Sequence, residues 1–179
     1  MPRTHNIFGG GNKTNENGLK FERDTSLDDV LINAGYTIKD FYVYDRDNNM
    51  IGLSVPQNNL YKNFLEKENI DYKKYNSKKW KPDEAFINFK NKTVYIIEKK
   101  YQATAGSVDE KLPNCDFKKK EYEKLFTPLE FKVEFIYVLS KWFFEHETYR
   151  DTLEYIRSVG CEYFSEIIPF ESLGLEKDD

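Results

Sequence analysis

The sequence is poor in cysteine and histidine, with two residues of each. Cys115 and Cys161 are too few for a disulfide framework or a cysteine-based metal cluster, so we expect two reduced, buried thiols. His5 and His146 lie far apart, and neither has a metal-ligating neighbour at helical spacing. These absences argue against a histidine-based metal site and against acyl transfer by a Cys/His pair.

Long hydrophobic runs are also missing. No segment approaches the roughly 18 apolar residues that a membrane span needs, and the N-terminal residues contain no apolar signal-peptide core. We therefore expect a soluble, cytoplasmic protein with no membrane partner. A chain of 179 residues can bury a core without covalent staples. The absence of repeats and long linkers predicts one domain over residues 1–179.

The charge is unevenly distributed along the chain. The net charge of -4 argues against a simple nucleic-acid binder when it is taken alone. However, residues 62–100 are rich in lysine, whereas acidic residues outnumber basic ones in residues 145–179. This contrast suggests one positively charged face, although a solvated lysine-rich surface explains it equally well.

The N-terminal segment is rich in glycine and asparagine. The composition of residues 1–18 predicts a loop, and residues 1–16 in particular are expected to form a flexible arm. The segment Gly9 to Thr14 superficially resembles a phosphate-binding loop, but it lacks the glycine before Lys13 and no strand precedes it. We therefore do not assign a nucleotide site to this segment.

The rest of the chain alternates between helical and β-rich patterns. Their order predicts an α/β fold with a mixed central β-sheet flanked by helices. The expected elements are a helix at 17–34, a hairpin of 36–44 with 50–55, a short helix at 60–68, a hairpin of 84–89 with 93–98, a helix at 108–126, a strand at 131–144 and a helix at 148–159.

Candidate catalytic residues gather around the second hairpin. Asp83 precedes its first strand, Glu98 ends its second strand, and Lys100 follows on the same face as Glu98. Pairing across the turn at 90–92 would bring these three side chains together. On spacing alone, a surface hairpin with charged ends explains them better, because Asp, Glu and Lys are commonly exposed.

The same residues also make chemical sense as a metal site. Mg²⁺ prefers carboxylate and carbonyl oxygens, which Asp83, Glu98 and the backbone carbonyl of Lys99 would supply; Mn²⁺ would substitute. The metal would acidify a water and screen the charge that develops on a phosphodiester. Lys100 would orient or deprotonate the attacking water and counter that charge.

The flanking residues strengthen this interpretation. Pro82-Asp83, the hairpin, and then Glu98-Lys99-Lys100 resemble the P-D…(D/E)-x-K signature of the PD-(D/E)XK nuclease superfamily. More specifically, the sequence resembles type II restriction endonucleases, in several of which a Gln and a Gly-Ser-x-Asp-Glu-Lys-Leu segment follow the strand. Here these are Gln102 and residues 106–112, and residues 17–22 resemble the first helix of those enzymes. The resemblance spans roughly residues 17–112 and implies a restriction-endonuclease-like fold.

The resemblance also implies roles around the metal. Asp83 and Glu98 would bind Mg²⁺, Lys100 would position the water, and Glu22 would be an accessory acid. Gln102 would support the site or contact a phosphate, although an exposed strand-end glutamine is an equal alternative. Glu84 should face away from Asp83 and is a fallback metal ligand.

DNA contacts are expected on both sides of this core. Ser107 and Asp109 would cap a helix that begins at Val108, and Lys111 would add positive charge. The N-terminus of that helix would also hold a phosphate, although capping alone explains Ser107 and Asp109 nearly as well. Lys78 and Lys79 lie in a segment where lysines alternate with aromatic residues, a composition that suits nucleic-acid contact. A solvated loop with inward aromatic rings fits that segment equally well.

Together these features predict a type II restriction endonuclease that cuts double-stranded DNA. By resemblance it would act as a homodimer on a short, palindromic site, with a cognate methyltransferase as its genetic partner. The alternatives are a structure-specific repair, recombination or phage nuclease, and a catalytically silent DNA-binding module of the same fold.

Overall fold

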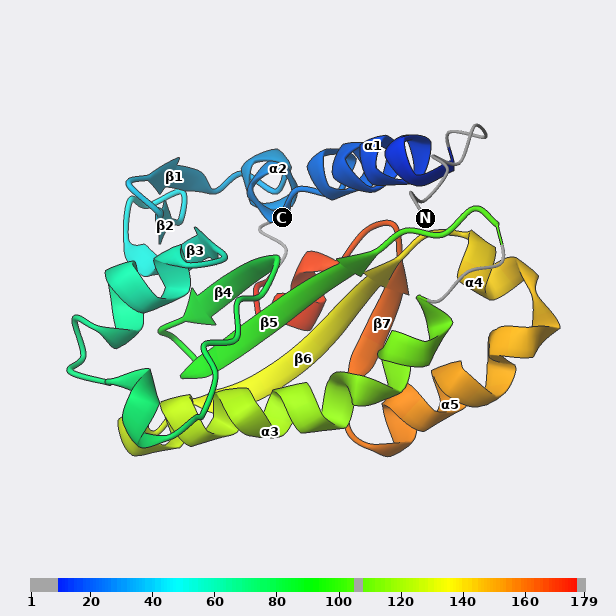
Figure 1. The fold of residues 1–179 in the computed structure, drawn as a ribbon. Helices are drawn as coiled ribbons and strands as arrows, with labels where there is room; N and C mark the ends of the chain where they lie inside the picture. Colours follow the sequence, from blue (N-terminus) through cyan, green and yellow to red (C-terminus); the bar gives the residue numbers. More distant parts are fainter. Residues whose placement is uncertain (1–9, 105–107, 177–179) are drawn as a thin grey trace.

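The computed structural model describes residues 10–104 and 108–176, and a seven-stranded sheet lies at its centre (Figure 1). The strands lie in the order in which they occur in the chain. They are β1 (Thr37–Lys39), β2 (Tyr42–Tyr44), β3 (Met50–Pro56), β4 (Glu84–Asn88), β5 (Thr93–Lys100), β6 (Lys132–Leu139) and β7 (Glu162–Ser165).

The sheet is mixed, as predicted. From β1 to β5 each strand is antiparallel to the next, whereas β5, β6 and β7 are parallel to one another. Parallel neighbours need a long crossover connection, and helices α3 and α5 supply the two that are required. The predicted α/β architecture with flanking helices is therefore confirmed.

Helices cover both faces of this sheet (Figure 1). On one side lie α1 and α2, and on the other lie α3 and α5. No described helix is both long and apolar enough to cross a membrane. The α-helices are α1 (Gly10–Asp24), α2 (Leu27–Asn33), α3 (Cys115–Phe126), α4 (Trp142–Glu145) and α5 (Arg150–Ser158).

Strand β5 separates two hydrophobic cores. Val94 and Ile96 belong to the core that includes Leu125 of α3, whereas Tyr95 and Ile97 belong to the core that includes Leu31 of α2. This alternation follows from the period of two of an extended chain. It continues into the polar end of the strand, so Glu98 and Lys100 face the α3 side and Lys99 faces the α1 and α2 side.

The N-terminal part of the chain differs from the prediction. Residues 10–16, expected as part of a flexible arm, lie in α1, and residues 1–9 fall outside the described part. The single helix expected at 17–34 is two helices, because Ser26 breaks it: its side chain accepts a hydrogen bond from the Asp29 amide and starts α2. Gly35 follows α2 with a φ of 96°, which glycine adopts readily, and so ends the helix as predicted.

Several other boundaries were also wrong. The strand expected at 36–44 is the tight hairpin β1–β2, whose turn holds Asp40 and Phe41 at positive φ. The helix expected at 60–68 is a π-helix at Tyr61–Leu65. The strand expected at 131–144 ends at Leu139, because α4 follows, and β7 had no predicted counterpart.

The helix expected at 108–126 begins later than predicted. A 3-10 helix, Asp109–Asn114, replaces its first turns, and α3 starts at Cys115. Pro113 lies inside the 3-10 helix and has no N–H to donate, so the segment cannot continue as regular α-helix through this position.

Candidate active site

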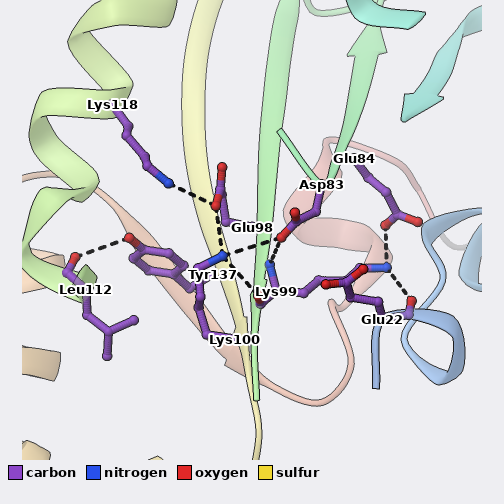
Figure 2. A network of polar contacts seen from close by, with 9 residues as sticks. All are labelled: Glu22, Asp83, Glu84, Glu98, Lys99, Lys100, Leu112, Lys118 and Tyr137. Carbon is purple, nitrogen blue, oxygen red and sulfur yellow. Dashed lines mark hydrogen bonds and ion pairs between the residues drawn. The ribbon is translucent and has the colours of Figure 1, made fainter. Parts of the chain in front are cut away.

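The β4–β5 hairpin places Asp83 beside the polar end of β5 (Figure 2). Glu84 pairs with Ile97 in this hairpin, so Asp83 lies next to Glu98 and Lys99. The contact is direct, since the Lys99 amide donates a hydrogen bond of 2.7 Å to Asp83 Oδ2. A backbone N–H thus fixes the aspartate carboxylate at the end of the buried hairpin.

Three oxygens converge at this point on the ammonium of Lys100. Its Nζ lies 2.9 Å from Glu98 Oε2, 3.0 Å from the Lys99 carbonyl oxygen and 3.5 Å from Asp83 Oδ2. The structure therefore brings together the two carboxylates, the carbonyl and the lysine that the sequence singled out.

The charges of this cluster stabilise one another. Glu98 is only 5% exposed, and burial raises the pKa of its carboxyl. The ammoniums of Lys100 and Lys118 outweigh burial, so the pKa of Glu98 lies below its ordinary value. Burial lowers the pKa of Lys100, but Glu98 and Asp83 more than offset this, and the net pKa is raised. Lys100 is therefore a protonated ammonium at neutral pH.

Lys118 of α3 is a member of the cluster that sequence reasoning missed. Its Nζ lies 2.9 Å from Glu98 Oε2, the same oxygen that Lys100 contacts (Figure 2). Nothing in the sequence separates Lys118 from its neighbours Lys119 and Lys120. Only the packing of α3 against the Glu98 face of β5 reveals its role.

Glu22 approaches the cluster from the opposite side, from α1 (Figure 2). Its carboxyl has a raised pKa, first because it is partly buried and second because of the nearby negative charge of Asp83. Glu22 and Asp83 also line a common cavity of about 760 Å³ between α1, α2 and the start of β4. The structure thus places Glu22 near the carboxylates, although it provides no contact between Glu22 and Lys100.

The side chain of Lys99 lies on the other face of β5 and is 2% exposed. Its Nζ contacts Glu84 Oε2 at 2.8 Å and the Glu22 carbonyl oxygen at 2.9 Å. The Glu84 carboxylate in turn accepts from the Leu27 amide at the first turn of α2. The Glu84 carboxylate therefore contacts Lys99 and the first turn of α2, whereas the Asp83 carboxylate contacts Lys100.

The donor set fits a hard divalent cation. The three oxygens that Mg²⁺ would need already surround a positive charge, the Lys100 ammonium. Within residues 10–104 and 108–176, no three His, Cys, Asp or Glu side chains lie close enough to hold a metal by themselves. The Lys99 carbonyl would therefore act as a third protein ligand, and substrate or water oxygens would complete the set.

Gln102 does not join the cluster. Its side chain is buried, and its Nε2 donates a hydrogen bond of 2.7 Å to the Tyr149 hydroxyl. Its backbone amide donates to Ser140 Oγ, which ties the end of β5 to the residue that follows β6. These contacts give Gln102 a structural position away from Asp83 and Glu98.

The predicted DNA-contacting residues are scattered. Ser107 and the side chain of Asp109 lie outside what the structure describes, and Lys111 is exposed in the 3-10 helix. Lys78 covers the Trp80 ring at 4.3 Å. Lys79 packs over Tyr61 at 4.5 Å and pairs with Glu66 at 3.7 Å, so its charge is engaged within the protein.

The comparisons with known proteins agree with this geometry. A family model described as the PD-(D/E)XK nuclease superfamily domain matches residues 24–125, which include β1 to β5 and nearly all of α3. The searches of curated proteins and of solved structures gave no match. The matched residues contain Asp83, Glu98 and Lys100, and more than half of the chain is covered. This chain therefore belongs to the PD-(D/E)XK nuclease superfamily.

Proposed function

We propose that the chain is a Mg²⁺-dependent endonuclease that hydrolyses phosphodiester bonds in double-stranded DNA. The observation that carries this proposal is the convergence of Asp83 Oδ2, Glu98 Oε2 and the Lys99 carbonyl on one cation position in a PD-(D/E)XK domain. Asp83, Glu98 and the Lys99 carbonyl would hold Mg²⁺, and Mn²⁺ would substitute. When bound, the metal acidifies water and screens the charge that develops on the phosphodiester.

Each residue has a distinct part in the reaction. A water oxygen attacks phosphorus, the bond from phosphorus to the 3′ oxygen breaks, and that oxygen takes up a proton, leaving 5′-phosphate and 3′-hydroxyl ends. Lys100 would orient or deprotonate the attacking water and counter the charge that develops on the phosphodiester. Glu22, which lines the same cavity as Asp83, would be an accessory acid near the metal.

Within this activity we propose the type II restriction kind of cleavage, at a short palindromic sequence by a homodimer. The support is the similarity of Gln102 and residues 106–112 to the corresponding segment of type II enzymes. A cognate methyltransferase would then be the genetic partner. The second candidate is a structure-specific repair, recombination or phage nuclease, which needs the same metal site but no base recognition.

A plasmid-cleavage assay tests the activity. Supercoiled DNA should be nicked or linearised with Mg²⁺ or Mn²⁺ and remain intact with EDTA. Asp83→Asn should abolish cleavage yet still bind DNA in Ca²⁺, and Asp47→Asn, in the exposed β2–β3 turn, should cleave like the wild type. If the wild type shows no metal-dependent cleavage and Asp83→Asn binds DNA equally well, the domain is a DNA-binding module without activity.

Mapping the ends on a sequenced plasmid separates the two kinds of nuclease. Discrete fragments with one repeated end sequence support the restriction enzyme. Smears, or cleavage confined to junctions and flaps, support the structure-specific nuclease instead.

A further inference from the structure

Two lysines share one oxygen of Glu98, and only one of them belongs to the E-x-K motif. Lys100 reaches Glu98 Oε2 along β5, and Lys118 reaches it from α3, each at 2.9 Å. Two ammoniums this close repel each other, so the carboxylate between them must hold both in place. The arrangement is stable only while Glu98 has no other cation to neutralise.

Lys118 differs from the other lysines of α3. Lys119 donates to the Gly160 carbonyl, Lys120 pairs with Asp116, and Lys124 pairs with Glu121. None of these partners is a candidate metal ligand, whereas the partner of Lys118, Glu98, is one. The side chain of Lys118 is 20% exposed, so water and ions can reach it.

The net charge around Glu98 becomes positive when a divalent cation enters. Asp83 and Glu98 contribute two negative charges when ionised, and Lys100 and Lys118 contribute two positive ones, so the charges of these contacting side chains balance. A dication at the three oxygens adds two positive charges to this balanced set. A phosphodiester group carries a single negative charge and would offset part of that surplus.

The same entry releases a lysine. The dication and the Lys100 ammonium cannot occupy one position, so Lys100 must leave the three oxygens when the metal binds. Glu98 then shares its charge with the dication, and its hold on Lys118 weakens. Lys118 becomes an available cation at the moment when the cluster needs an anion.

We propose that Lys118 is a substrate-binding residue that exchanges Glu98 for a phosphate oxygen of the DNA strand once the metal is bound. This inference rests on the proposed nuclease function and names the α3 side of the cluster as the place where the strand's backbone lies. In the metal-free protein, Lys118 holds Glu98 in place. With metal, it anchors the DNA.

The test compares Lys118→Met and Lys118→Arg with Lys120→Met, an exposed lysine two residues away on the same helix. Metal affinity is measured by calorimetry with Mn²⁺ in the absence of DNA. DNA affinity is measured in Ca²⁺ over a range of salt concentrations, with a duplex that the wild type cuts or, failing cleavage, any duplex of the same length.

Lys118→Met should bind Mn²⁺ as tightly as the wild type or more tightly, because one competing ammonium is gone. It should bind DNA about tenfold more weakly, and the slope of log Kd against log salt should decrease by about one, as for loss of one phosphate contact. Lys118→Arg should retain the slope, and Lys120→Met should leave metal affinity unchanged and alter DNA affinity less than Lys118→Met does.

Two results would overturn the inference. One is weaker Mn²⁺ binding by Lys118→Met with an unchanged DNA salt slope, which would mean that Lys118 only supports Glu98. The other is a Lys118→Met variant that matches the wild type in every measurement. A wild type that binds DNA through Lys118 but never cleaves it would refute the nuclease proposal and leave this inference standing.

Discussion

Two adjacent lysines at the end of β5, Lys99 and Lys100, lie on opposite faces of the strand and differ in their surroundings. Lys99 is 2% exposed and pairs with Glu84 on the side of α1 and α2, whereas Lys100 is 19% exposed and pairs with Glu98 and Asp83 on the side of α3. Both are lysine–carboxylate contacts of similar length. The difference lies in what surrounds them and in how many partners compete for each charge.

The Lys99 contacts tie elements together. Its ammonium joins Glu84 of β4 to the Glu22 carbonyl of α1, and the Glu84 carboxylate also accepts from the Leu27 amide of α2. The Lys100 contacts instead crowd two carboxylates and two ammoniums into a partly open cluster. The Lys99 contacts therefore connect elements of the fold, whereas the Lys100 contacts lie within the candidate active site.

The largest expected effect comes from Lys100. Lys100→Met should lower the cleavage rate about a thousandfold, because the charge near the reacting phosphate is lost. The melting temperature should fall less than in Lys99→Met, because Lys118 still contacts Glu98, and Lys90→Met, at the exposed turn of the same hairpin, should cleave normally. Cleavage rates and thermal unfolding of the two variants measure this. Substantial activity in Lys100→Met would show that the E-x-K lysine is dispensable.

Lys99→Met should have its main effect on stability. Removing one partner of a buried ion pair leaves Glu84 uncompensated, at a cost of about 3 kcal/mol in the free energy of unfolding. Urea unfolding at pH 7 measures this cost, with Lys100→Met as the matched variant on the other face. The comparison between the lysines fails if Lys99→Met unfolds like the wild type but cannot cleave.

The smallest expected effect is on the pH dependence of stability, which should differ between Glu98 and Glu22. The pKa of Glu98 is lowered from its ordinary value of 4.5. Its contribution to the stability of the fold is therefore present above pH 4.5 and is lost as the pH falls through the lower, folded-state pKa. The pKa of Glu22 is raised from 4.5, so its contribution is present below pH 4.5 and is lost as the pH rises through the folded-state pKa.

Glu98→Gln and Glu22→Gln should therefore respond in opposite directions. As the pH rises from 3 to 7, Glu98→Gln should lose melting temperature relative to the wild type, and Glu22→Gln should gain it. Thermal unfolding in EDTA at several pH values gives both curves. Curves that run parallel for the two variants would contradict the assigned electrostatics.

The proximity of the candidate site residues was predictable because they are local in sequence. Asp83, Glu98 and Lys100 lie at the ends of one hairpin, and a period of two fixes which of them share a face. Lys118 could not be found in this way, since it meets Glu98 only through the packing of α3. Gln102 had an attractive place in the motif, but its amide is bonded to Tyr149 across the fold.

The errors in the fold have similar causes. The break before α2 did carry a local signal, because Ser26 followed by Asp29 three residues later is typical of a helix start. The turn at Asp40 and Phe41 had little local sequence signal, because a phenylalanine at positive φ is unusual and depends on the surrounding structure. Strand β7 is four residues long and too short for its pattern to be recognised.

The first turn of α2 restricts the direction from which DNA can approach. Its Leu27 amide is already bonded to the Glu84 carboxylate, and Asp28 and Asp29 add negative charge there. A backbone phosphate would be repelled from this side, so we expect the duplex to enter from the side of α3. In a two-fold assembly on one duplex, both copies would then turn α3 inward and leave α1 and α2 on the outside.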